Sequence, residues 1–281
     1  MQFMGYRRQD GQVGVRNHIA VVPTVFCSST VARMIANATG AMEFTHDGGC
    51  GQLGPDKEHT ERILRGIVTH PNVGGVLVVG LGCEQVDAKT LAGAAAGKVA
   101  HHIDTHELGG NSAAVEAGIK VVREMTAALE GAERRPASID ELVLATQCGS
   151  SDTGSGLASN PVVGVLADKL VEMGGTVLLG ETSSLYGAAG VMARRAISPE
   201  VGRRIIEITE VRERYYARMG KRLKDANPTP GNIAGGLTTL VEKSLGGVRK
   251  GGTTPIQGVL AAGEPVRGKG LWVMDTSMGL G

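Results

Sequence analysis

Histidine, cysteine and carboxylate side chains lie in the glycine-rich loops of this sequence, where they could bind a metal or transfer protons. The segment FTHDGGCGQLG holds His46 and Cys50 among four glycines, and GLGCEQ holds Cys83 and Glu84. Imidazole and thiolate ligands suit zinc or iron, and thiolates can also hold an iron–sulfur cluster. A carboxylate such as Glu84 can supply an oxygen ligand or act as an acid or a base.

These reactive residues share a position, because each of them follows a short apolar run. Cys27 follows HIAVVPTV, Cys148 and Asp152 follow ELVLAT, and Glu181 follows TVLLG. In open parallel sheets, ligands bind outside the carboxyl ends of the strands. We therefore expect His46, the cysteines and these carboxylates to gather at one edge. Their spacing matches no zinc ribbon or ferredoxin pattern, so the hypothesis depends on the shared position.

Simpler interpretations exist for each of these residues. An isolated cysteine is often a small buried hydrophobe. His46 stands beside a glycine turn, where a histidine can simply hydrogen-bond to the backbone. Glu84 and Asp152 can serve as helix caps. The sequence leaves these alternatives open.

Short apolar runs alternate with helical patterns along the chain. The runs predict strands at residues 18–25, 41–45, 73–81, 99–103, 141–146, 176–180 and 271–274. The patterns predict helices at residues 28–38, 56–70, 86–98, 113–129, 160–173 and 184–196, and a longer helix starts at Ser198-Pro199. Nearly continuous apolar runs such as VLVVGL are typical of strands buried on both faces. The alternation predicts an α/β fold with Rossmann-like, mostly parallel sheets and helices on both faces.

The same pattern predicts two α/β domains. The segment GAERRPAS, residues 131–138, is polar, contains proline and lacks periodicity, so it is the best candidate for a linker. A boundary there gives a first domain of residues 1–137 and a second of residues 138–281.

Charge and composition exclude several classes of protein. The formal net charge is +1 with acids and bases mixed along the chain, so we expect neither nucleic acid nor a membrane as a partner. No apolar run approaches the roughly 18 residues of a membrane span, and the N-terminus lacks the apolar segment of a secretion signal. Four widely spaced cysteines form no disulfide framework in a chain of 281 residues. A reduced, cytoplasmic protein is the expectation.

Five long motifs run in order along the chain: GYRRQDGQVGVRN, THDGGCGQLG, HPNVGGVLVVGLGCE, QCGSSDTGSGLASNP and NPTPGNIAGGLTTLVEKSLGG. Together they resemble the serial motifs of the altronate/galactarate dehydratase family. The resemblance implies a hydro-lyase that removes water from a hydroxylated sugar acid such as altronate or galactarate. It also implies a divalent metal, most often iron. A sister group with similar motifs acts as sulfolactate sulfo-lyase and eliminates sulfite instead of water.

The resemblance carries over to individual residues of this sequence. Metal ligands would come from His46, Cys50, Cys83 and Cys148. Catalytic residues would be His46, Glu84, Arg16 and Asp152, with the Arg16 guanidinium holding the substrate carboxylate through its bidentate fork. Further substrate contacts would come from Arg7, Asn17 and Asn160, and Glu181 joins them because it follows a predicted strand. Which residue is the base, and whether the iron is Fe²⁺ or an iron–sulfur cluster, stays open.

The start of the chain bears on its partners. Members of the family with a single long chain carry a small β-clip domain before the GYRR motif, whereas Met1 lies four residues before that motif here. This start resembles the two-subunit arrangement, in which a separate small chain supplies the β-clip domain; a shortened chain would begin in the same way. We also expect a homo-oligomer.

The end of the chain bears on activity. It stops at WVMDTSMGLG, inside what resembles a family motif, so we expect a second domain that is incomplete at its C-terminus. KSLGG also stands where some altronate dehydratases resemble KSLGC, which removes any ligand role there. The sequence leaves open whether this polypeptide is active by itself. A small-molecule-binding remnant of the family and a structural subunit are the alternatives from other classes.

Overall fold

The computed structural model describes residues 1–95 and 97–276, and the chain divides into two compact units. The N-terminal unit comprises Gln2–Ala137 and Gly263–Pro265. The C-terminal unit comprises Met1, Ser138–Ala262 and the chain from Val266 onward. In the described part of the chain, every helix is too short or too polar to cross a membrane.

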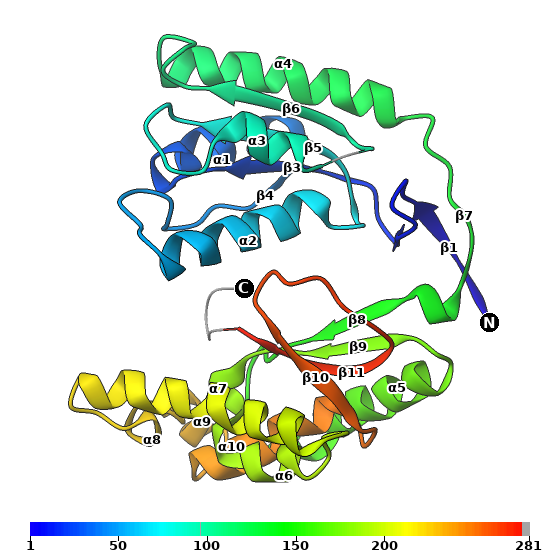
Figure 1. Cartoon of the computed structure of the whole chain (residues 1–281), viewed down its shortest axis with the longest axis vertical. Helices are drawn as coiled ribbons and strands as arrows, with labels where there is room; N and C mark the ends of the chain where they lie inside the picture. Colours follow the sequence, from blue (N-terminus) through cyan, green and yellow to red (C-terminus); the bar gives the residue numbers. More distant parts are fainter. Residues whose placement is uncertain (96, 277–281) are drawn as a thin grey trace. The chain divides into compact units, whose positions relative to one another are not determined.

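A parallel four-stranded sheet forms the centre of the N-terminal unit (Figure 1). Its order is β4 (Met42–Glu43), β3 (His18–Pro23), β5 (Val73–Gly80) and β6 (Val99–Asp104). After β3 the chain adds β4 on one side and then crosses to add β5 on the other. The point where the strand order reverses therefore lies between β3 and β5.

Helices cover both faces of this sheet, and β5 alternates between them because successive side chains of a strand point to opposite faces. The covering helices are α1 (Ser29–Thr39), α2 (Pro55–Thr69), α3 (Ala88–Gly93) and α4 (Asn111–Leu129). Leu77 belongs to the core that contains Ile35 of α1 and Met125 of α4. Val78 belongs to a separate core with Leu64 of α2. The predicted α/β class with helices on both faces is confirmed here.

The C-terminal unit contains a second parallel sheet of four strands. Its order is β10 (Ile256–Ala261), β11 (Gly270–Asp275), β9 (Thr176–Leu179) and β8 (Val143–Thr146). Strand β10 was missed by the sequence analysis, because a glycine and a glutamine interrupt its apolar pattern. The other three strands match predicted apolar runs.

One hydrophobic core joins this second sheet to its helices. The helical segments are η2 (Ile139–Glu141), η3 (Ser155–Ser159), α5 (Asn160–Glu172), η4 (Thr182–Ala188), α6 (Ala189–Ala193), α7 (Pro199–Arg218), α8 (Leu223–Ala226), α9 (Pro230–Ala234), α10 (Leu240–Gly247) and η5 (Val248–Gly251). Leu170, Met192 and Ile205 meet Leu271 of β11 in the core. The predicted start of the long helix is confirmed, since the Ser198 side chain accepts a hydrogen bond from the first turn of α7.

A third, small sheet was not predicted at all. It has the order β2 (Val13–Gly14), β1 (Gln2–Arg7) and β7 (Arg135–Ser138). Residues 135–138, predicted to belong to a linker, thus form a strand. Pro136 fits there because β7 lies at the edge of its sheet, where a missing N–H group breaks no interior hydrogen bond.

Candidate functional site

Three of the four cysteines follow neighbouring strands of the N-terminal sheet. Cys27 lies in η1 (Phe26–Ser28) after β3, Cys50 follows β4, and Cys83 follows β5. Their loops touch one another: the Phe26 N–H donates to the Gly48 carbonyl at 2.9 Å, and the Gln85 N–H donates to the Gly49 carbonyl at 3.5 Å. This is the edge at which the strand order reverses and where ligands bind in such sheets.

The Glu84 carboxylate organises the loop after β5. Its Oε1 accepts hydrogen bonds from the Thr24 hydroxyl at 2.7 Å and the Leu81 N–H at 3.0 Å. Its Oε2 accepts from the N–H groups of Gly82 at 2.7 Å and Cys83 at 2.9 Å. Four donors therefore surround this carboxylate, and Glu84 joins the loops after β3 and β5.

These hydrogen bonds decide the charge of Glu84. Partial burial is the largest single influence and raises the pKa of Glu84, but the bonds from Thr24 and from backbone N–H groups act together in the opposite direction and hold the pKa below its usual value. A general base works best when its pKa lies near the working pH. Glu84 is therefore held in its ionised form at neutral pH, where it organises the loop, and this pKa does not favour it as a general base.

His46 is also engaged with the backbone. Its Nδ1 accepts a hydrogen bond from the Gly48 N–H at 3.1 Å, and its Nε2 lies 3.0 Å from the Pro23 carbonyl oxygen. Because a carbonyl can only accept, Nε2 carries the proton and Nδ1 does not. Both ring nitrogens are occupied, which is the simpler interpretation that the sequence had left open.

The predicted metal ligands are divided between the two units. Cys27, Cys50 and Cys83 are exposed, and Cys148, which belongs to the C-terminal unit, is half-buried. Among the residues that the structure describes, no three histidine, cysteine or acidic side chains lie close enough together to hold a metal ion. The donors as placed do not fit a bound metal, so no chemical step is assigned to one.

Arg16 and Asn17 precede β3 and so lie at the amino end of the sheet, at the opposite edge from Glu84. Asn17 accepts a hydrogen bond from the Arg8 guanidinium at 2.9 Å. The Arg16 guanidinium donates to the carbonyl of Val15 at 3.0 Å. Arg7 lies in the small sheet, where its guanidinium donates to the Pro136 carbonyl at 3.5 Å. Within the N-terminal unit, none of these three residues joins His46 and Glu84.

In the C-terminal unit, the ends of β8, β9 and β11 bring Cys148, Glu181 and Thr276 together. The Glu181 carboxylate accepts from the Cys148 N–H at 3.0 Å and from the Ser184 hydroxyl at 2.6 Å. The Glu181 N–H donates to the Thr276 hydroxyl at 2.6 Å. Glu181 is buried and has a φ of 70°, a left-handed conformation that is unfavourable for a residue with a Cβ.

Asp275 lies at the same edge, as the last residue of β11. Its Oδ1 accepts from the Thr182 hydroxyl at 2.6 Å and lies 3.6 Å from the Arg212 guanidinium of α7. Arg212 was not predicted from the sequence, because its place on a charged helix gave no sign that it pairs with a strand end.

A pocket of about 390 Å³ opens beside the loop that follows β8. It is lined by residues from this loop, from η3 and the start of α5, and from the segment around α10: Ser151, Asp152, Thr153, Ser155, Gly156, Leu157, Asn160, Leu237, Glu242, Lys243, Leu245, Gly246 and Arg249. We call it the β8 pocket. It contains two of the predicted site residues, Asp152 and Asn160.

Lys243 is the residue in the β8 pocket whose position most needs explaining. It is 8% exposed, and its ammonium donates to the side-chain oxygens of Asn227 and Asn232, each at 3.0 Å. The structure shows no ion pair between Lys243 and a carboxylate of any residue it describes. Lysine is almost never buried without a paired charge. An anionic ligand in the pocket would supply that charge.

Asn232 joins Lys243 to the loop after β8. Its amide nitrogen donates to the Ser151 carbonyl at 2.9 Å, while its amide oxygen accepts from Lys243. Asn160, in turn, donates to the Gly246 carbonyl at 3.1 Å. The motifs that contain these residues were recognised in the sequence, but the burial of Lys243 depends on three segments meeting and could not be predicted from spacing.

Comparison with known families matches nearly the whole chain. Residues 5–130 match the second domain of D-galactarate dehydratase/altronate hydrolase. Residues 139–279 match the C-terminal domain of D-galactarate/altronate dehydratase.

Three characterised relatives are similar over almost all of this chain. The altronate dehydratase of Bacillus subtilis (strain 168) is 35% identical and covers 97% of the chain, which spans 57% of that protein. The altronate dehydratase of Escherichia coli (strain K12) is 34% identical over 95% of the chain and 56% of that protein. The (2R)-sulfolactate sulfo-lyase subunit beta of Chromohalobacter salexigens is 37% identical over 98% of the chain and 71% of that subunit. The chain thus spans little more than half the length of both altronate dehydratases.

Proposed function

Because this chain belongs to the D-galactarate/altronate dehydratase family, we propose that it forms part of a lyase that removes water from a hydroxylated sugar acid. The observation that supports a substrate site in this chain is the buried Lys243 of the β8 pocket, whose ammonium forms no ion pair with any residue that the structure describes. A sugar acid carries the carboxylate that this ammonium lacks.

The reaction requires a base that removes a proton and a cation that stabilises the resulting negative charge, and the β8 pocket can supply both. The proton on the carbon next to the carboxylate must leave, which places a second negative charge beside the first. A fixed cation close to the carboxylate stabilises that charge without reorganising during the reaction. The electron pair of the broken C–H bond then forms the C=C bond, and the neighbouring hydroxyl departs and takes up a proton to leave as water.

Asp152 is the carboxylate of the pocket that fits the role of base. Its Oδ1 accepts a hydrogen bond from the Ser155 N–H at 2.6 Å, which fixes the side chain on the exposed rim of the pocket. Asn160 lines the same pocket and offers its amide to the substrate hydroxyls. Glu84 and His46, the other catalytic candidates, are held by the hydrogen bonds described above.

Iron remains a proposal that comes from the resemblance alone. The described residues do not bring three suitable donors together, so the roles given to Lys243 and Asp152 do not depend on a metal. When bound, a divalent ion would act as a Lewis acid toward the carboxylate and hydroxyl oxygens of the substrate.

Elimination of sulfite from sulfolactate is the second candidate. It is favoured by the 37% identity to the sulfo-lyase subunit beta, of which this chain covers 71%. Since that relative is one subunit of an assembly, we propose that a small second subunit joins this chain as well. Sulfolactate is also an anion with a carboxylate, so Lys243 would serve both reactions.

Calorimetric binding of galactarate, altronate and sulfolactate tests the substrate site without requiring turnover. We expect Lys243→Met to weaken binding of the preferred acid at least tenfold, while Lys169→Met, an exposed lysine on α5, leaves it unchanged. Asp152→Asn should bind the acid but lose turnover when the complete assembly is assayed. Unaltered binding by Lys243→Met would exclude this pocket.

A second pair of variants tests the same site in case Lys243→Met does not fold. Leu157 lines the pocket and is 78% exposed, so it tolerates a charge. Leu157→Glu should weaken binding of the acid severalfold, whereas Leu157→Gln should not, because only the former repels an anion.

A further inference from the structure

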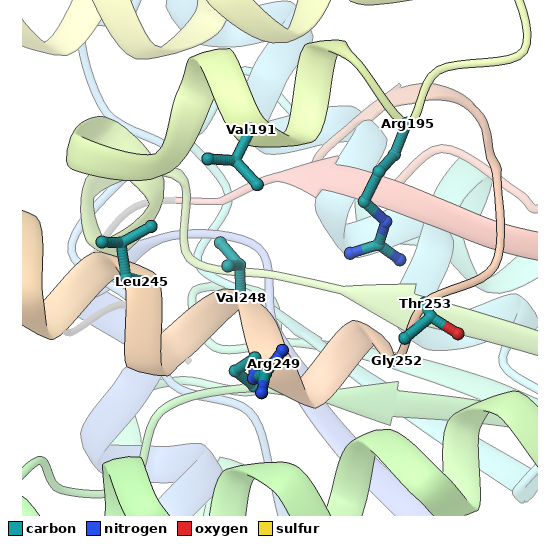
Figure 2. Close-up of a pocket in the computed structure, with 7 residues that line it drawn as sticks. All are labelled: Val191, Arg195, Leu245, Val248, Arg249, Gly252 and Thr253. Atoms are coloured by element: carbon teal, nitrogen blue, oxygen red, sulfur yellow. The ribbon is translucent and has the colours of Figure 1, made fainter.

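A second pocket lies in the C-terminal unit at the amino end of β10. It has a volume of about 330 Å³ and is lined by α6, η5 and the segments that follow them: Val191, Arg195, Leu245, Val248, Arg249, Gly252 and Thr253 (Figure 2). The Ile256 N–H donates to the Arg195 carbonyl at 2.9 Å, which ties the segment after α6 to the start of β10. Cys148 and Glu181 lie at the other end of this sheet, so we call this the amino-end pocket.

Two guanidinium groups line the amino-end pocket. Arg195 points from the end of α6 toward η5 and Thr253 (Figure 2) and donates to the carbonyls of Gly251 at 3.3 Å and Thr254 at 2.9 Å. Its Nε is buried and has no hydrogen-bond partner among the described residues. Arg249 makes no side-chain hydrogen bond or ion pair with any residue that the structure describes.

Asp168 is the acid whose charge acts on Arg195, and one carboxylate faces two guanidinium groups here. Asp168 accepts hydrogen bonds from the Thr253 N–H at 2.7 Å, the Thr253 hydroxyl at 2.9 Å and the Thr254 N–H at 3.2 Å, so its oxygens serve the loop. Burial lowers the pKa of Arg195; Asp168 partly opposes this effect, and repulsion from Arg249 adds to it. Positive charge is therefore in excess here, and a bound anion would relieve it.

The loop that forms one wall is held in a single shape. Gly252 has a φ of +62°, and a Cβ at this position would lie 2.1 Å from Oδ1 of Asp168. Both facts require glycine, and the three hydrogen bonds to Asp168 fix the residues on its far side. A pre-formed wall reduces the ordering cost of binding a ligand.

Apart from the two arginines and Thr253, whose hydroxyl donates to Asp168, the side chains of the lining are apolar. Val191, Leu245 and Val248 face the space beside the guanidinium groups. A hydroxyl group placed against these side chains would lose its hydrogen bonds to water, which disfavours sugar acids in this pocket. We propose that the amino-end pocket binds a short aliphatic carboxylate, with the carboxylate on Arg195 and Arg249 and the alkyl chain on the valine and leucine side chains.

Thermal unfolding and calorimetry with sodium valerate test this site on the full chain. The wild type should gain roughly 2 to 5 °C in Tm at tenfold excess over Kd. Pentanamide, which has the alkyl chain without the charge, and inorganic phosphate, which has charge without the chain, should give no comparable shift. Arg195→Gln should weaken valerate binding at least tenfold, while Arg194→Gln, the exposed neighbouring arginine, should retain it.

Because Arg195 also supports the loop, Val191→Glu provides a second test. Val191 is 37% exposed on the rim, and a glutamate there would repel a carboxylate while leaving both arginines in place. Loss of the valerate shift in Val191→Glu, with galactarate binding unchanged, supports the site. Valerate binding that survives in both Arg195→Gln and Val191→Glu would overturn the proposal, as would an equal response to pentanamide or phosphate.

Discussion

The Thr24 hydroxyl donates a 2.7 Å hydrogen bond to Oε1 of Glu84, and this bond connects two loops that are 60 residues apart in the sequence. Thr24 is fully buried, so the bond is shielded from water on one side. The same carboxylate holds three backbone N–H groups of the loop after β5. The shape of this sheet edge therefore depends on one ionised side chain.

Glu84→Gln tests this dependence. The amide cannot accept four hydrogen bonds as the carboxylate does, so we expect the free energy of unfolding to fall by about 1–2 kcal/mol. Glu107→Gln, an exposed change at the same edge, should be neutral within about 0.5 kcal/mol. Chemical denaturation of both variants measures the difference, and equal stabilities would show that Glu84 does not organise the loop.

The stabilisation by Glu84 should depend on pH in a defined direction. Its folded-state pKa lies below the usual 4.5, so the contribution is fully present above that value and is lost as the pH falls through the lower, folded-state pKa. The gap in stability between wild type and Glu84→Gln should therefore be constant from pH 6 to 8 and shrink below about pH 4.5. A gap that widens on acidification would contradict the ionised state.

Gly49 and Gly51 flank Cys50. Alanine substitutions at these two positions distinguish the cost of backbone strain from the cost of a steric collision. Both have a positive φ, of 98° and 65°, so alanine is strained at either position. Only at Gly49 would the new Cβ collide with backbone, 2.4 Å from the Thr24 carbonyl oxygen; at Gly51 the space is open. We expect Gly51→Ala to cost about 1 kcal/mol and Gly49→Ala at least about 2 kcal/mol more. Equal costs would mean that the loops after β3 and β4 do not meet.

Lys98 provides a prediction at alkaline pH. Its ammonium donates to the carbonyls of Val68 and His70 at the end of α2, and burial, aided by repulsion from Arg8, lowers the pKa of Lys98 to about 8. Between pH 8 and the ordinary 10.5, the unfolded chain holds this proton more firmly than the folded chain. The free energy of unfolding of the wild type should thus rise with pH in this range relative to Lys98→Met.

The control for Lys98 is Lys89→Met, which removes an exposed lysine from α3. The difference in the free energy of unfolding between this variant and the wild type should stay constant between pH 8 and 10. Urea titrations at four pH values measure these free energies. If the stability of the wild type relative to Lys98→Met fell with rising pH, folding would favour the charged ammonium.

Thiol reactivity tests the iron proposal. Cys27, Cys50 and Cys83 are exposed and Cys148 is half-buried, so a thiol reagent should modify three groups quickly and the fourth more slowly in metal-free protein. If Cys50 and Cys83 are ligands, anaerobic addition of Fe²⁺ should protect both but not Cys27. Mass spectrometry of the labelled peptides identifies them, and labelling that iron leaves unchanged would exclude these two thiolates as ligands.

The sequence predicted the parts of the fold that depend on periodicity. The apolar run at β5 and the stripes of α2 and α4 are local patterns, and the structure confirms them. Strands β1 and β2 were missed because β1 is largely exposed and β2 has only two residues, and β7 was missed because its pairing with β1 joins residues more than 100 positions apart. Such pairing leaves almost no local signal.

The sequence predicted the positions of the reactive residues better than it predicted their roles. That the cysteines follow strand ends could be derived from the order of apolar runs. The hydrogen bonds of His46 and Glu84 could not, because they depend on turns at Gly49 and Gly82 whose positive φ values no spacing rule reveals. Lys243 was quoted only as part of a motif, since its burial requires Asn227, at the end of α8, and Asn232, in α9, to reach its ammonium.

Residues 263–265 belong to the N-terminal unit although the chain on both sides of them belongs to the other one. Gly263 lies against α2, where a Cβ would come within 2.8 Å of the Arg62 carbonyl oxygen. A gene fragment that ends at residue 137 would therefore lack a piece of its own fold and leave part of α2 bare. A fragment meant to carry the N-terminal unit alone should therefore retain residues 263–265 through a linker to residue 137.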